Sequence, residues 1–173
     1  MRKVGYRPRL TKEEQKIIDD YRNNNDNRVL VVGDVHAPFG KEGYLQFCID
    51  TYKKYQCNKV VFIGDIIDNH YSSYHETDSD GKGGGDELQL AIERVSDWYK
   101  AFPEAYVTVG NHDAIIMRKA QSSSIPSKWI KNYNEVLGTP NWKWVTDVII
   151  DDVRYVHGHK SSKARTAAKR DMQ

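Results

Sequence analysis

Short apolar runs alternate with amphipathic segments along most of the chain. Four runs rich in β-branched and aromatic residues predict strands at residues 29–32, 60–63, 105–109 and 154–156. Segments with the apolar spacing of a helix face lie between the first three of them. Strands that alternate with helices predict an α/β fold with a largely parallel sheet and helices on its faces.

Capping and breaking residues delimit the predicted helices. Thr11 and Glu14 form a capping box that opens a helix to about Tyr21, with Ile17 and Ile18 as its apolar contacts. A second helix spans residues 43–56, and its apolar face is made of Leu45, Cys48, Ile49 and Tyr52.

A third helix has the clearest apolar stripe. Asp86 is its predicted N-cap, and Pro103 stops it before the next strand. Its stripe consists of Leu88, Ala91, Ile92, Val95, Trp98 and Phe102. Each of these helices therefore has one face to bury against the sheet.

Two regions interrupt this alternation. Residues 71–86 are rich in Gly, Ser and Asp and predict a loop, which either borders a site or simply connects two elements. After a short helical region at 126–137, residues 144–150 and 153–156 predict a hairpin that turns at Asp151 and Asp152. We expect this hairpin to begin a second sheet within one domain that spans residues 1–173.

Composition adds few constraints. The 173 residues include 26 basic and 24 acidic side chains. The net charge of +2 is too small to create an overall positive potential that would attract nucleic acid. Cys48 and Cys57 are predicted to be free thiols, because Cys48 falls on an apolar helix face. No apolar stretch approaches the ~20 residues of a membrane span, and the N-terminus lacks the apolar core of a signal peptide. We expect a cytoplasmic protein with no membrane partner, in the host cytoplasm if a phage encodes it.

Potential metal ligands follow each predicted strand. Asp34 and His36 follow the first strand and could grip one ion, whereas the central Asp65 could bridge two ions with its two oxygens. Asp68 is better suited to cap a helix or to accept a hydrogen bond from a ligand than to bind metal itself.

The third and fourth strands lead to similar chemistry. Asn111 offers a neutral oxygen, His112 an imidazole that Asp113 could orient, and His157 a further imidazole. Taken singly, each segment also fits an ordinary capped turn or a histidine at a strand end. Because all four strand ends show the pattern, a shared metal site is the better interpretation.

In order, these segments resemble the signature blocks of calcineurin-like metallophosphoesterases, and the small phage and bacterial forms most closely. The resemblance covers nearly the whole chain from about residue 29. It implies a metallophosphoesterase-type β-sandwich of mixed sheets flanked by helices. The segments that carry it are Gly33-Asp34-Val35-His36, Gly64-Asp65-Ile66-Ile67-Asp68, Gly110-Asn111-His112-Asp113 and His157-Gly158-His159.

The resemblance also implies the roles of individual residues. Asp34 and His36 bind one divalent ion, Asn111 and His157 bind a second, and Asp65 bridges the two. Manganese is the preferred ion, with iron, zinc, nickel or magnesium as alternatives. His112, with Asp113 behind it, acts as acid or charge stabiliser. A metal-bound hydroxide then hydrolyses a phosphomonoester or a phosphodiester, with nucleic acid among the candidate substrates.

One block of the family pattern lacks a match. A Gly-His-any-His segment normally follows the fourth block, and residues 157–160 do not fit it. We therefore expect an incomplete second sheet, with self-association or a complementing C-terminal segment as a consequence. The alternative to an active enzyme is an impaired or split metallophosphoesterase that binds metal or nucleic acid.

Substrate contacts are less specific in the sequence. His70 and His75 flank the predicted loop and could reach a substrate, although surface histidines are the slightly better interpretation. Tyr71 and Tyr74 could stack on a base or pack beneath the loop. The basic residues after Lys160 could contact phosphates or form a solvated helix face.

Overall fold

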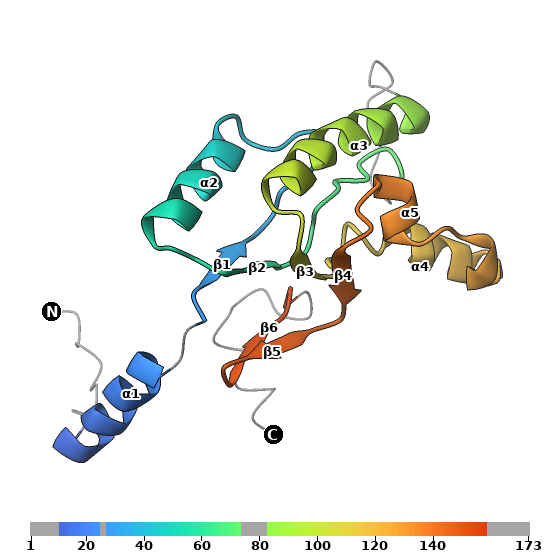
Figure 1. Cartoon of the computed structure of the whole chain (residues 1–173). Coiled ribbons are helices and arrows are strands. Elements are labelled where there is room, and N and C mark those ends of the chain that lie inside the picture. Colours follow the sequence, from blue (N-terminus) through green and yellow to red (C-terminus); the bar gives the residue numbers. More distant parts are fainter. Residues whose placement is uncertain (1–10, 25–26, 74–82, 159–173) are drawn as a thin grey trace, which may run out of the picture.

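The computed structural model describes residues 11–24, 27–73 and 83–158 (Figure 1). The helical elements are α1 Lys12–Asn24, α2 Tyr44–Lys54, α3 Gly84–Ala101, α4 Ile115–Ser122, a 3-10 turn at Ser127–Trp129, and α5 Tyr133–Leu137. The strands are β1 Val29–Val32, β2 Lys59–Phe62, β3 Ala105–Thr108, β4 Trp142–Val145, β5 Val148–Ile150 and β6 Val153–Tyr155.

A parallel sheet with strand order β1-β2-β3-β4 forms the centre of the fold, as the alternation of strands and helices predicts. Figure 1 shows α2 and α3 on one face of this sheet and the β5–β6 hairpin on the other. Asn27 Nδ2 donates to Asp151 Oδ1 at 3.0 Å and joins the hairpin turn to the start of β1. The parallel strands all end at the same edge, where their following loops meet.

The predicted hairpin is correct only in its second half. Residues 142–145 pair with β3 as the fourth parallel strand, and only β5 and β6 form the antiparallel pair. Trp142 explains the difference, since its side chain is 1% exposed in the core on the helix side of the sheet. The hairpin turns at Asp151 and Asp152, whose φ values of 53° and 59° are typical of a type I′ turn.

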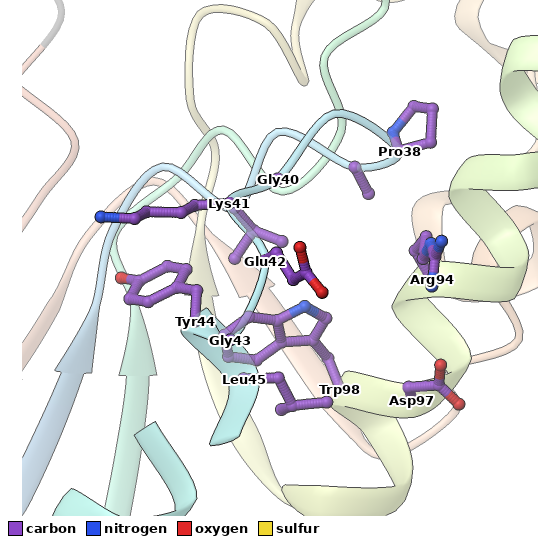
Figure 2. Close-up of a pocket in the computed structure, with 12 residues that line it drawn as sticks. Pro38, Gly40, Lys41, Glu42, Gly43, Tyr44, Leu45, Arg94, Asp97 and Trp98 are labelled. Atoms are coloured by element: carbon purple, nitrogen blue, oxygen red, sulfur yellow. The ribbon is translucent and has the colours of Figure 1, made fainter. Parts of the chain in front are cut away.

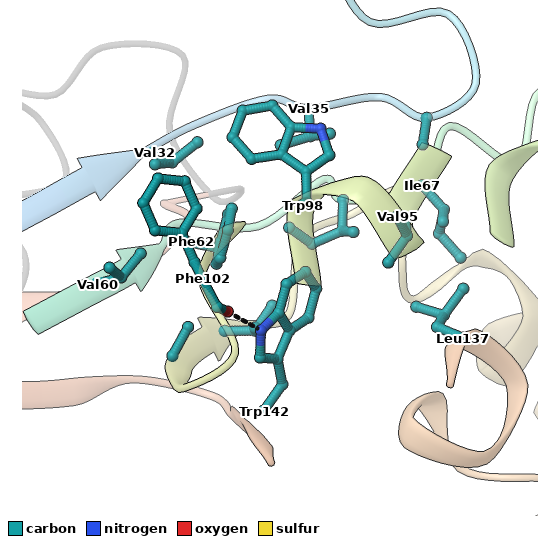
Figure 3. Packing of buried hydrophobic residues seen from close by; sticks show 14 of the residues in the cluster. Val32, Val35, Val60, Phe62, Ile67, Val95, Trp98, Phe102, Leu137 and Trp142 are labelled. Atoms are coloured by element: carbon teal, nitrogen blue, oxygen red, sulfur yellow. Dashed lines mark hydrogen bonds between the residues drawn. The ribbon is translucent and has the colours of Figure 1, made fainter. Parts of the chain in front are cut away.

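Aromatic rings fill the core between the sheet and α3 (Figure 3). Phe62 lies 4.8 Å from Trp142 and 5.8 Å from Trp98, measured between ring centroids. The indole Nε1 of Trp142 donates to the Phe102 carbonyl oxygen at 2.8 Å. Phe102 is the C-cap residue of α3, and this bond gives its buried carbonyl a donor. This core holds the helix layer against the strands that carry the predicted ligands.

The helix predictions hold with corrections. The capping box at the start of α1 is confirmed, because Thr11 N donates to Glu14 Oε2 and Glu14 N to Thr11 Oγ1. The prediction that Ile17 packs inward is wrong, since it is 68% exposed, and the Ile18 side chain lies outside the described residues. Leu88, 36% exposed, likewise lies outside the buried face of α3.

Asp86 is not the N-cap of its helix. The helix begins at Gly84, with Gly83 in the capping position, so the Asp86 charge falls in the first turn near the positive end of the helix dipole. Within α2, Cys48 is buried as predicted, and both cysteines are free. Among the described residues no helix is long and apolar enough to cross a membrane.

Replacing Trp142 by Phe is expected to lower the free energy of unfolding by about 1–3 kcal/mol, because the buried Phe102 carbonyl loses its donor. Urea unfolding followed by circular dichroism measures the change. Trp129→Phe is the matched control, since Trp129 is 78% exposed, and it should change stability by less than about 0.5 kcal/mol. Equal unfolding midpoints for the two variants would contradict the role given to Trp142.

Candidate metal centre

The ends of the strands bring the predicted ligands together with an unusual backbone. Asp34, His36 and Asp65 have φ values of 49°, 45° and 52°, in the left-handed region that residues other than glycine rarely adopt. Such conformations cost about 1–3 kcal/mol each and persist where the surrounding structure imposes them, often at functional sites. Three of the five predicted ligands share this feature.

Two glycines allow the segments to approach closely. Gly64 has a φ of 89°, and a Cβ there would lie 2.5 Å from His157 Nδ1. A Cβ on Gly110 would overlap the carboxylate of Asp65. These contacts leave no room for a side chain at either position, so both glycines are needed to bring the loops after β2, β3 and β6 together.

The carboxylate of Asp65 lies at the centre of the site, and this side chain is 6% exposed. Its Oδ1 accepts a hydrogen bond from the His112 backbone N–H at 2.9 Å. Its Oδ2 lies 3.8 Å from His36 Nε2 and 3.2 Å from His157 Nε2. Oδ2 is thus the oxygen that faces both imidazoles, and the prediction that Asp65 bridges two ions stays a prediction.

Hydrogen bonds orient the two imidazoles that face this oxygen. His157 Nδ1 lies 2.7 Å from the Ile63 carbonyl oxygen, which can only accept, so Nδ1 carries the proton. His36 Nδ1 lies 2.6 Å from Asp68 Oδ1, which favours the same tautomer. In both neutral rings the lone pair is then on Nε2, the nitrogen directed at Asp65.

The donor set fits divalent metal ions. His157 Nε2 faces two oxygens, Asp65 Oδ2 at 3.2 Å and Asn111 Oδ1 at 2.8 Å, and a cation between these three atoms would be bound by all of them. His36 Nε2 similarly lies 4.0 Å from Asp34 Oδ1. Ligands bound at about 2.0–2.2 Å from one ion lie about 3–4 Å apart, as these atoms do.

Exposure differs between the two halves of the site. The side chain of Asp34 is 70% exposed, whereas that of His157 is 10% exposed. Ligand atoms of Asp34, His36 and Asp65 all lie within 4.8 Å of one another. The half with Asp34 is therefore open to solvent, and the half with His157 is enclosed.

Asp68 contacts two imidazoles. Its predicted position outside the ligand set stays a prediction, because ligand atoms of His36, Asp68 and His112 also lie close enough together to hold an ion. Besides binding His36, Asp68 lies beside His112, whose Nδ1 is 2.6 Å from the Asp68 carbonyl oxygen and 3.4 Å from its Oδ1. The ring of His112 stands edge-on to that of His36, with centroids 4.7 Å apart. Asp68 thus fixes both rings from behind.

The predicted role of Asp113 as the partner of His112 is wrong. Its carboxylate is fully buried and accepts hydrogen bonds from four backbone N–H groups, those of Gly110, Asp65, Ile66 and Ile67. Burial raises the pKa of Asp113 to about 6, although the amides of Gly110, Ile67 and Asp65 oppose the shift. Asp113 therefore holds two ligand loops together instead of touching a substrate.

The predicted substrate histidines receive little structural support. His70 is exposed, and its backbone N–H donates to Glu87 Oε1 at 2.7 Å. His75 lies outside the described residues. The buried Glu87 carboxylate also accepts a hydrogen bond from Tyr71 N at 2.8 Å, so it binds two successive backbone N–H groups. In the sequence, the only sign of this contact is an acidic residue in the first turn of a helix.

The sequence profile of calcineurin-like phosphoesterases matches residues 27–172. The chain belongs to the calcineurin-like phosphoesterase family. The parallel sheet with its flanking helices agrees with the metallophosphoesterase fold, and the family is one of metal-dependent enzymes that act on phosphate esters. A search of curated proteins finds no match.

A pocket with charged residues beside the loop after β1 lies outside the candidate metal centre (Figure 2). Val35 and Ala37 line it, whereas His36 between them faces Asp65. Figure 2 shows Lys41 and Glu42 on one side and Arg94 on α3 on the other. The loop thus separates this pocket from the candidate ligands.

Asp113→Asn is expected to destabilise the metal-free phosphoesterase by about 2–4 kcal/mol, because an amide nitrogen would face backbone N–H groups that need an acceptor. Chemical unfolding measures this loss. Asp97→Asn is the control, because Asp97 is exposed and pairs only with Lys100 among the described residues. A loss no larger than that of the control would show that Asp113 does not hold the loops.

Proposed function

We propose that this chain hydrolyses a phosphomonoester or phosphodiester with two divalent metal ions. Asp34, His36 and Asp65 hold one ion, and Asp65, Asn111 and His157 hold the other. The observation that carries the proposal is the position of Asp65 Oδ2, which faces the Nε2 atoms of both His36 and His157. One oxygen that faces two oriented imidazoles can be shared by two ions, each bound by one of the imidazoles.

Two bound ions would polarise the phosphoryl oxygen and lower the pKa of a water molecule. The chain itself supplies the orientation of the ligands. Asp68 and the Ile63 carbonyl hold the rings of His36 and His157, so both Nε2 atoms are directed before a ligand binds. Such preorganisation lowers the free-energy cost of assembling the site.

His112 is proposed to assist the departure of the alcohol. Its Nδ1–H is engaged by the Asp68 carbonyl, so Nε2 is the nitrogen left to meet a substrate. A proton on Nε2 can be donated to the leaving oxygen or can stabilise charge on the phosphate. The side chain is 32% exposed, which allows contact with a bound ester.

The nature of the ions and of the substrate belongs to the same proposal. Imidazole, carboxylate and amide ligands together suit manganese, with iron, zinc, nickel and magnesium as alternatives. Nucleic acid is one candidate substrate among phosphate esters. The two free cysteines fit a reducing compartment such as the cytoplasm.

Asp65→Asn is expected to lose both metal and activity, because an amide oxygen is a weaker bridging ligand than a carboxylate. Elemental analysis of the purified protein, together with manganese-dependent hydrolysis of an aryl phosphodiester, measures both properties. We expect a fall in rate of about a hundredfold or more. Asp50→Asn, at an exposed position on α2, is the control and should retain both.

Two results would contradict the proposal. Full activity in Asp65→Asn would exclude the proposed bridge. Wild-type protein that binds metal but hydrolyses no phosphate ester with any of the five ions would favour an impaired or split enzyme that needs a complementing chain. Self-association or restoration of turnover by such a chain would then be the property to measure.

Asp68→Ala is expected to weaken metal binding by about 10–100-fold, the usual effect of removing a group that orients a metal ligand. Calorimetric titration with manganese measures the affinity. The reason is that His36 would lose the acceptor 2.6 Å from its Nδ1. An unchanged affinity would mean that packing alone orients the His36 ring.

A further inference from the structure

Arg118 lies beside the proposed metal centre on an element that the mechanism does not use. It belongs to α4, which follows the Asn111 loop, and its side chain is exposed. Its Nη2 donates to the Asn111 backbone carbonyl at 2.8 Å. One hydrogen bond to a rigid loop therefore positions the guanidinium while most of its five N–H donors remain available.

The positive charge of Arg118 is not neutralised by its described neighbours. Within the described part of the chain, no carboxylate lies within 4.0 Å of this guanidinium. Asp147, which follows Thr146 in the sequence, is paired with Arg154, whose Nε lies 3.0 Å from Asp147 Oδ2. An arginine is always charged and binds phosphate through two parallel hydrogen bonds, so this group is suited to an anion.

A small cavity adjoins both Arg118 and the ligand Asn111. Its volume is about 180 Å³, and it lies between the loop after β3, the start of α4 and the segment after β4. Val109 and Ala114 give it apolar walls, and Arg118 supplies its charge. A small apolar group with an anionic substituent matches this combination. The residues around it are Val109, Gly110, Asn111, Ala114, Arg118 and Thr146.

We propose that this cavity holds the alcohol portion of the substrate and that Arg118 binds a second phosphate carried by that alcohol. The proposal rests on the proposed phosphoesterase function and makes it more specific. In the reaction, water adds to phosphorus, the bond between phosphorus and the alcohol oxygen breaks, and a proton ends on that oxygen. Bisphosphorylated substrates are thus preferred over monophosphorylated ones with the same body.

A purely structural role for Arg118 makes a different prediction. If the side chain only holds the Asn111 carbonyl, its removal disturbs Asn111 and harms every substrate equally. If it binds a second phosphate, its removal harms only substrates that carry one. The loss of activity in the Arg118 variant, compared between substrates with and without a second phosphate, therefore separates the two roles.

The test compares phenyl phosphate with resorcinol bisphosphate and hydroquinone bisphosphate, which share one aromatic ring. We expect the wild-type enzyme to prefer at least one bisphosphate by about 10–100-fold in kcat/KM, the effect of charge-assisted hydrogen bonds. Arg118→Met should reduce that preference to about threefold or less, and Arg118→Lys should retain part of it. Arg94→Met, an exposed arginine on α3, is the matched control and should keep the full preference.

Salt and binding measurements complete the test. Added salt should weaken the preference, because it screens an exposed charge. If the wild type hydrolyses none of the compounds, the proposed function fails, and calorimetric binding of the same three compounds decides the role of Arg118 alone. Tighter binding of a bisphosphate that is lost in Arg118→Met supports the inference. No preference in the wild type, or an equal loss for all compounds in Arg118→Met, overturns it.

Discussion

One carboxylate joins the two loops on which the site depends. Asp113 accepts backbone N–H groups from Asp65, Ile66 and Ile67 after β2 and from Gly110 after β3. These donors come from segments separated by more than forty residues, so the carboxylate replaces water for both at once. Without an acceptor, several buried amides would lack partners, and each such group costs about 1–3 kcal/mol. The candidate ligands can converge because the buried Asp113 carboxylate accepts hydrogen bonds from both loops.

The same arrangement explains how the left-handed backbone of the ligands persists. Asp65 has a φ of 52°, and its own N–H is bound by Asp113 while its Oδ1 is bound by His112 N. Residue 36 is held similarly, because its N–H donates to the Asp65 carbonyl at 2.9 Å. These contacts offset the conformational cost before any metal binds. Hydrogen bonds to the backbone therefore help to hold this edge of the sheet in its unusual conformation.

The sequence predicted the local parts of the structure well and the non-local parts less well. The apolar runs, the capping box at Thr11 and the turn at Asp151 and Asp152 depend on neighbouring residues, so their patterns identify them. Residues 142–145 continue directly toward the hairpin, yet they join the parallel sheet, where Trp142 is buried against Phe62. Partner choice among strands is a tertiary property that a periodic pattern does not encode.

The candidate site shows the same limit for side chains. Asp34, His36 and Asp65 were predicted because ligand-type residues follow strands, and the structure brings their ligand atoms within 4.8 Å of one another. Asp113 follows His112 in sequence, yet its carboxylate binds the loop after β2, because a side chain in a tight turn points away from its neighbour.

The same reasoning applies to exposed arginines. Arg118 is indistinguishable in sequence from any other basic residue on a helix, and only its contact with the Asn111 carbonyl places its charge beside the candidate metal ligands. Residues that directly follow strands can therefore be found from the sequence. Side chains that act across loops can be found only from three-dimensional contacts.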